Sequence, residues 1–199
     1  FLSHLLSLSG LILWFCFIYS HLSDWQVSKQ ELKKAPLLSG MATFPMAGMI
    51  LSTYLLRILP TSMGIIAQAL WWFAFLLDVG LIIYFTKNYV QTKPRTSATP
   101  SWTVLYVGIA VASLTYPVVG IVEIAYGAWI FGFTLTLFLY PLIYQDLKSN
   151  PLPRALLGQE GIYCAPFSLL LAALVRIEGS GLHGWILLVM ILASQTFFF

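Results

Sequence analysis

Seven apolar stretches, each close to the length that crosses a lipid bilayer, dominate this chain of 199 residues. The hydrocarbon core of a membrane needs about 20 apolar residues in a helix. Only 9% of the residues are charged, whereas a soluble domain carries about 25%, so the chain has too little polar surface for a soluble fold. We therefore predict an all-α integral membrane protein with about seven transmembrane helices. We expect them at residues 1–22, 37–58, 62–86, 101–119, 124–145, 158–176 and 182–199.

The connections between these stretches differ sharply in charge. Loops 23–36, 87–100 and 146–157 hold eight of the ten Lys and Arg residues, and Arg57 and Arg176 are the other two. Short basic loops remain on the cytoplasmic side of a membrane. We therefore expect these three loops in the cytoplasm and the first residue outside, in a multi-pass protein of the cell (plasma) membrane.

The short turns between the other stretches group the helices into hairpins. We expect hairpins at residues 37–86, 101–145 and 158–199, with 1–22 as half of a further hairpin, in a single polytopic transmembrane domain 1–199. Repeated units of this kind bury their faces against their neighbours. The chain begins without a Met inside one apolar run and ends inside another. We therefore expect it to be the middle of a longer protein, incomplete at both ends.

The first helix of each hairpin contains a helix breaker at a comparable depth, at Pro45, Gly108 and Pro166. A proline removes one backbone N–H and displaces the carbonyl four residues earlier, which here belongs to Met41 or Ile162. Freed backbone is tolerated at membrane depth where it lines a wet cavity or is buried in protein. Breakers in three successive helices favour a shared central cavity. The alternative is that they only bend the helices for packing.

Small and hydroxyl residues accompany the breakers, whereas the second helices of the hairpins are bulky. Small residues allow helices to approach closely, so the first helices are expected to lie inside and the second ones outside. We predict that the inner helices line a central pore. The candidate pore-lining residues are Thr43, Pro45, Gly48, Gly108, Ser113, Pro166 and Ser168.

The charge of the solute is predicted from what these inner helices lack. Their middles, at about 41–56, 103–117 and 162–175, contain no Asp, Glu, Lys or Arg. A cation pathway normally uses rings of carboxylates, whereas a weakly binding anion pore relies on dipoles and basic mouths. Half-helix N-termini also face anions, although freed carbonyls attract cations. The absence of carboxylates favours an anion.

Asp78 is the strongest exception, because it lies within the apolar run 62–86. An acid at membrane depth is energetically expensive and is a functional candidate by default. We interpret it as a candidate acid for proton coupling. The alternative is that it forms a hydrogen bond with a neighbouring helix.

Other polar residues give weaker signals. Gln159 and Glu160 are candidates for a cytoplasmic vestibule, and the alternative, which we favour for Glu160, is that it caps the first turn of its helix. Cys16 and Cys164 lie in apolar segments without a CxxC spacing, which is typical of core residues. The three histidines are scattered over different segments, so we expect no metal and no cofactor.

Three stretches follow a shared pattern of motifs. A Pro-aromatic opening leads one inner helix, a long outer helix then ends in a polar loop with Leu-Pro, and Ala165-Pro166 stands in the middle of the next inner helix. The stretches are TPSWTVLYVGIAVASLTYPVVG, FGFTLTLFLYPLIYQDLKSNPLP and RALLGQEGIYCAPFSLLLAAL. In these motifs the chain resembles the tellurite-resistance/dicarboxylate transporter family, which includes the bacterial TehA channel and the plant slow anion channels.

This resemblance implies a ten-helix fold of five hairpins around a quasi-fivefold central pore, usually as a homotrimer. The predicted crossings then correspond to the second to eighth helices of that fold. The family's pore-occluding phenylalanine is on the ninth helix, so Phe197, Phe198 and Phe199 do not take that role. Many members have Pro-Thr before the inner helix where this chain has LGQEG, which leaves the local chemistry of the pore mouth open.

We therefore predict membrane transport of small anions, such as a C4-dicarboxylate like malate, sulfite or inorganic monovalent anions, by a channel or a proton-linked carrier. The expected partners are the anionic solute and the lipid bilayer, with no nucleic acid. The alternative is a structural or assembly protein without a permeation path. An intramembrane enzyme is less favoured, because the sequence has no HExxH, no Gly-x-Ser-x-Gly, no paired intramembrane acids and no P-loop.

Overall fold

The computed structural model describes residues 2–31, 33–92, 96–152, 154, 158–159, 161–162, 165–179, 189 and 192. Throughout this part of the chain every regular element is helical, which confirms the predicted all-α class. The elements are α1 (Leu2–Ser23), α2 (Trp25–Glu31), α3 (Ala35–Gly40), α4 (Thr43–Ile58), the 3-10 helix η1 (Thr61–Met63), α5 (Gly64–Phe85), the π-helix η2 (Thr86–Val90), α6 (Ser101–Val107), the 3-10 helix η3 (Gly108–Ala110), α7 (Val111–Thr115), the 3-10 helix η4 (Tyr116–Val118), α8 (Val122–Ser149) and α9 (Ala165–Glu178).

Five helical stretches in the described part of the chain are long and apolar enough to cross a membrane. They are His4–His21, Ala35–Ile58, Thr61–Val90, Ser101–Val118 and Val122–Ser149, and they confirm the first five predicted crossings. The sixth, predicted at 158–176, is represented by α9, which begins only at Ala165. The seventh, predicted at 182–199, lies outside the described residues apart from Val189 and Leu192.

Two of these stretches extend further than predicted. Helix continues to Val90 and to Ser149, whereas the apolar runs end at about residues 86 and 145. The exposed side chains of Lys87 and Lys148 lie in these extensions. Long basic side chains lay their methylene groups along apolar surface and keep the charge in water, so they are compatible with a helix that leaves the membrane. Hydropathy therefore marks the end of the apolar zone rather than the end of the helix.

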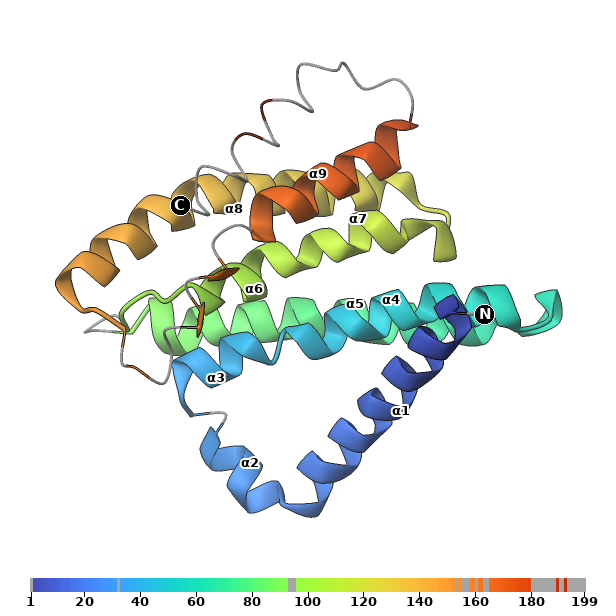
Figure 1. Cartoon of the computed structure of the whole chain (residues 1–199), viewed down its shortest axis with the longest axis horizontal. Coiled ribbons are helices and arrows are strands. Elements are labelled where there is room, and N and C mark those ends of the chain that lie inside the picture. The colour runs from blue at the N-terminus through green and yellow to red at the C-terminus, as the bar shows by residue number, and fades with distance from the viewer. Residues whose placement is uncertain are drawn as a thin grey trace.

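The spanning helices from α3 onward run back and forth along roughly one direction, and α1 crosses them obliquely (Figure 1). The start of α1 and the short turns after α4 and η4 lie at one end of the bundle (Figure 1). The connections that precede α3 and that follow η2 and α8 lie at the opposite end, and these are the basic ones. At the turn before α8, Gly120 has a φ of 76°, a left-handed conformation that glycine adopts without a steric penalty.

The first helix of each described hairpin is more buried than the second. In the spanning window of α3–α4, 50% of the residues are buried, and in that of α6–η3–α7 the share is 78%, whereas it is 28% in the spans of both α5 and α8. The helix α7 packs against both α4 and α9, while α8 covers α6, α7 and α9 from the other side and α5 packs mainly on α4. The inner and outer assignment made from small and bulky residues therefore agrees with the packing.

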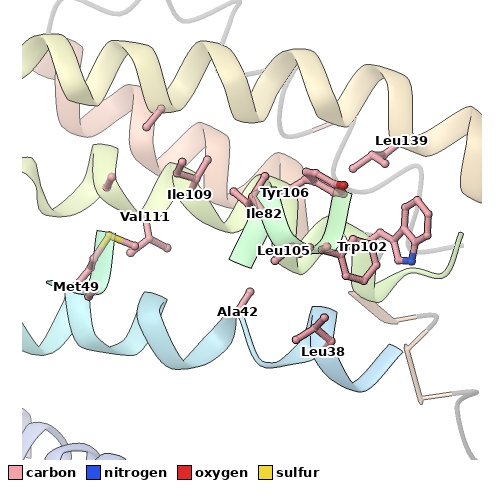
Figure 2. Close-up of a cluster of buried hydrophobic side chains, with 14 of the residues drawn as sticks. Leu38, Ala42, Met49, Ile82, Trp102, Leu105, Tyr106, Ile109, Val111 and Leu139 are labelled. Atoms are coloured by element: carbon pink, nitrogen blue, oxygen red, sulfur yellow. The ribbon is translucent and has the colours of Figure 1, made fainter. Parts of the chain in front are cut away.

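The main hydrophobic core lies where α4, α5 and the α6–α7 helix meet (Figure 2). Figure 2 shows Met49 of α4 and Val111 of α7 pointing toward one another across this interface. Two tryptophans complete the core. The Trp71 indole N–H donates to Thr115 Oγ1 over 2.8 Å, and the rings of Trp102 and Phe85 make an edge-to-face contact with centroids 5.1 Å apart. Such pairs stabilise a core beyond the area that they bury.

The entry to α6 is fastened to the far end of α8. The backbone N–H of Ala98 donates to Asp146 Oδ2 over 2.7 Å, and the Asn150 side-chain amide donates to Ser97 Oγ over 3.3 Å. A hydrogen bond to a charged acceptor is among the stronger ones in proteins. The segment before α6 is thereby held against the second helix of its own hairpin.

The helix of the first described hairpin is interrupted at Met41 and Ala42, between α3 and α4. Pro45 occupies the third position of α4, where its missing N–H leaves no gap in the helix ladder. The carbonyl of Met41, which the sequence identified as the one that Pro45 leaves unbonded, accepts the N–H of Phe44 over 3.0 Å. The predicted break is present, and its freed carbonyl is satisfied by a tighter turn.

The second inner helix changes from α to 3-10 geometry at Gly108 and returns to α geometry at Val111. A Cβ built on Gly108 would lie 2.7 Å from Sδ of Met46, one residue after Pro45. Gly48, further along α4, packs in the same way: a Cβ there would lie 3.0 Å from Cβ of Ala74 on α5. The glycines thus allow three helices to approach one another closely around the interrupted region.

We predict that Gly48→Val lowers the thermal unfolding midpoint of the detergent-solubilised protein. The added side chain meets Cβ of Ala74, which no rotamer change moves away, and overpacking of a core costs about 1–3 kcal/mol. The matched control is Gly80→Val in α5, where a Cβ meets nothing within 4 Å. Equal midpoints for the two variants would show that the contact between α4 and α5 at Gly48 is not as close as described.

Candidate anion pathway

The breaks in two inner helices meet at one level of the bundle. Met46 stands one residue beyond Pro45, and its sulfur occupies the space beside Gly108 where the 3-10 segment begins. The sequence predicted a comparable depth for these breakers, and the contact between Met46 and Gly108 agrees with it. No charged side chain belongs to either break, because residues 41–48 and 104–111 are all uncharged.

Thr43 and Ser168 are the two candidate pore-lining residues with exposed side chains in the described structure. Thr43 Oγ1 donates to the carbonyl of Gly40 over 2.9 Å, across the interruption between α3 and α4. Ser168 Oγ donates to the carbonyl of Ala165 over 2.8 Å, in the first turn of α9. Each hydroxyl therefore covers a backbone carbonyl in the first turn of an inner helix.

The other five candidates are buried. Gly48 and Gly108 are in contact with neighbouring helices, as described above, and Pro45 and Pro166 lie in the first turns of α4 and α9 with their rings covered. Ser113 is fully buried, and its Oγ donates to the carbonyl of Ala125 on α8 over 2.7 Å. The structure thus places these five residues in helix–helix contacts. Pro166 is the second residue of α9 as described, and residues 163 and 164, which precede this helix, lie outside the described residues, so its predicted mid-helix position stays a prediction.

Asp78 is fully buried in α5. Neither of its carboxyl oxygens has a hydrogen-bond partner among the described residues, so the bond to a neighbouring helix that the sequence left open is not formed there. It lies on the inward face of α5, one turn from Ala74, which touches Gly48. A polar group buried without a partner is costly to a fold, and its position facing α4 places it near the level of the helix breaks.

The predicted vestibule is described only in part. Gln159 is half-buried and its Oε1 has no hydrogen-bond partner in the described structure. Glu160 lies outside the described residues, so neither its vestibule role nor its capping role is tested. Among the described His, Cys, Asp and Glu side chains, no group of three is placed to hold a metal ion.

The chain matches the SLAC1 family model, described as voltage-dependent anion channel, over residues 3–199. The chain belongs to this family. It is therefore an integral multi-pass membrane protein of an anion channel and transporter family, and not an enzyme. The resemblance to the plant slow anion channels read from the sequence is confirmed. Among curated proteins, no relative matches the chain.

Sequence reasoning missed the residue that joins α1 to the inner helices of this family member. The Trp14 indole N–H donates to the carbonyl of Phe44 over 3.1 Å, and the two rings stack with centroids 4.7 Å apart. Gly48 packs against this indole: a Cβ built on Gly48 would lie 3.5 Å from Cζ2 of Trp14. An aromatic residue in an apolar run carries no signal of such a role, because lipid-facing positions have the same composition.

We predict that Asp78→Leu raises the thermal unfolding midpoint of the purified protein. The substitution replaces a buried group without a partner by an apolar one of similar shape, and an unsatisfied buried polar group costs about 1–3 kcal/mol. Asp78→Asn is the matched control: it keeps two polar atoms at the site, so its gain is expected to be smaller. A lower midpoint for Asp78→Leu would mean that the carboxyl group has a stabilising partner.

Proposed function

We propose that this chain forms a transmembrane pathway for small anions along its inner helices α4, α6–η3–α7 and α9. The solutes proposed are C4-dicarboxylates such as malate, sulfite and inorganic monovalent anions. The observation that carries the proposal is the meeting of two helix interruptions, each within an uncharged segment, at Met46 and Gly108. Interrupted helices at membrane depth occur where backbone groups serve a cavity or are covered by protein. Membership in an anion channel family supports the role in which the backbone groups serve a cavity.

Electrostatics of the inner helices support an anion over a cation. The helices α4 and α9 begin at Thr43 and Ala165, and the N-terminal end of a helix carries roughly half a positive charge. Exposed hydroxyls at Thr43 and Ser168 lie in these same first turns. No carboxylate belongs to the first turn of either helix. Dipoles without fixed charge bind a solute weakly, which conduction requires.

For the complete assembly we propose the ten-helix, quasi-fivefold bundle implied by the family resemblance, assembled as a homotrimer. The succession of α4, α7 and α9 as neighbours, each backed by an outer helix, supports an inner ring. We also propose that the first residue is outside and the basic loops are cytoplasmic. The gathering of those loops at one end of the bundle supports this orientation (Figure 1).

The anion pathway predicts a dependence on the sign of charge at Ser168. In liposomes that contain the purified protein, Ser168→Asp is expected to lower the uptake of radiolabelled malate and chloride at least about tenfold, because a fixed negative charge repels an anion by several kcal/mol in a partly dehydrated site. Ser168→Lys, which adds a larger side chain with the opposite charge, is expected to retain uptake. Equal losses in both variants would remove Ser168 from the pathway. If wild-type liposomes leak no faster than protein-free ones, the structural or assembly function is the correct one.

We propose, second, that Asp78 gains and releases a proton during transport. Its complete burial without a hydrogen-bond partner supports this role, since intramembrane acids mark proton and ion pathways. No further carboxyl group lies on the elements that pack closely against α5 in the described structure. The titratable or charged side chains on these elements are Tyr54, Arg57, Lys87, Tyr89, Tyr106 and Tyr116.

A proton-linked cycle predicts that wild-type malate uptake rises as the external solution becomes more acidic. In Asp78→Asn, which cannot exchange a proton, uptake is expected to follow only the protonation of malate itself. The control is Glu123→Gln, which removes an exposed carboxyl group at the start of α8 and is expected to keep the wild-type pH profile. Superimposable profiles for the wild type and Asp78→Asn would exclude Asp78 as the coupling acid while leaving anion transport itself intact.

A further inference from the structure

A cavity of about 600 Å³ lies between α1 and α4, and its lining extends from Arg57 to Ala47, near Pro45. The stacked rings of Trp14 and Phe44 join the two helices on one side of it. On the other side, His4 Nδ1 and the Tyr54 hydroxyl are 3.4 Å apart. Arg57, which also lines the cavity, is roughly 18 Å along the helix axis from Pro45. The Arg57 end of the cavity is therefore distant from the break at Pro45, whereas Ala47 lines its other end.

The polar side chains of this cavity come from both helices and carry no negative charge. Arg57, Tyr54 and Thr53 line it from α4, and His4 and Ser7 line it from α1. No Asp or Glu is among the described residues that line the cavity. Arg57, which is exposed, therefore lines a space to which no described acidic residue contributes.

The position of Arg57 in the last turn of α4 has a simpler explanation, since cations are favoured at helix C-termini. That explanation does not account for the rest of the cavity. In the last turn of α4, the carbonyl of Leu55 already accepts the N–H of Leu59 over 2.9 Å. A histidine, a tyrosine and a serine, two of them from another helix, converge on the same space as Arg57. Convergence of several donors on one cavity is what distinguishes a binding site from a capped helix end.

We propose that this cavity binds an oxyanion, as a carboxylate or a phosphate, with Arg57 as the main ligand and Tyr54 and His4 as further hydrogen-bonding groups. The planar guanidinium donates two parallel hydrogen bonds to such a group. The Tyr54 hydroxyl makes only a long contact with His4, so it is available to donate to an incoming oxygen. The cavity is in the range of about 300–1,000 Å³ typical of organic ligands, which favours an oxyanion with a carbon body over a halide.

Two kinds of molecule present an oxyanion on a carbon body: a soluble C4-dicarboxylate, and an anionic lipid through its phosphate headgroup. The apolar side chains of Leu6, Ile50 and Leu51 also line the cavity, and they fit either the carbon chain of a solute or the start of an acyl chain. Both sources use the same contacts with Arg57. The site does not depend on the proposed transport, because it is defined by binding and its main ligand, Arg57, is distant from the breaks.

Binding is measured on the purified protein in nanodiscs of phosphatidylcholine. One arm titrates radiolabelled malate, and the other measures retention of phosphatidylglycerol by native mass spectrometry after doping it into the same nanodiscs. Arg57→Gln is expected to weaken malate binding, phosphatidylglycerol retention or both by a factor of at least about ten, because a charged hydrogen-bonding partner is lost. Tyr54→Phe, which removes only a hydroxyl, is expected to weaken binding of the same ligand by a smaller factor.

The matched control is Arg176→Gln, which removes an exposed arginine from the last turn of α9 and is expected to leave both measurements unchanged. Loss of malate binding alone assigns the site to a soluble oxyanion, and loss of lipid retention alone assigns it to a headgroup. If Arg57→Gln and Tyr54→Phe both bind malate and phosphatidylglycerol as the wild type does, the proposal is wrong. Because binding is measured without a gradient, this result is independent of any failure of anion flux.

Discussion

Backbone hydrogen bonding without water is the constraint on which the inner helices depend. An interrupted helix in a membrane exposes carbonyl and amide groups that lipid cannot satisfy. In this chain the groups at the first break are paired by a tighter turn, in which Phe44 N–H donates to Met41, and by the Thr43 hydroxyl, which donates to Gly40. At the second break the helix narrows to 3-10 geometry instead of opening. The interruptions persist because local pairing and close packing together replace the missing α-helical bonds.

Close packing around the breaks depends in turn on the absence of side chains. Gly108 leaves room for the sulfur of Met46, and Gly48 leaves room for both Ala74 and the indole of Trp14. Four helices therefore meet around the first half of α4. Without a hydrophobic driving force between helices in lipid, van der Waals contact of this kind and hydrogen bonds between helices are the main attractions. The hydrogen bond from Ser113 Oγ on α7 to the carbonyl of Ala125 on α8 is one such bond between helices.

Much of the fold was predictable, because the crossings and breaks depend on local chemistry. Apolar length gives five spans directly, and Pro45 and Gly108 mark interruptions because proline and glycine change what the backbone itself can do. The roles of individual residues were less predictable. Gly48 and Ser113 were expected to line a pore, yet their burial depends on which helix lies opposite, and a sequence pattern does not specify that partner. Likewise, the isolation of Asp78 and the meeting of His4 with Tyr54, fifty residues apart, are tertiary properties.

The hydrogen bond from Ala98 N–H to Asp146 joins the segment before α6 to the polar end of α8. Between Ala98 and Gly108 the chain is short and the helix α6 is almost entirely buried, so it has no hinge of its own. The open end of the second hairpin, where the chain enters α6 and leaves α8, is thus closed by side-chain hydrogen bonds in place of a covalent turn.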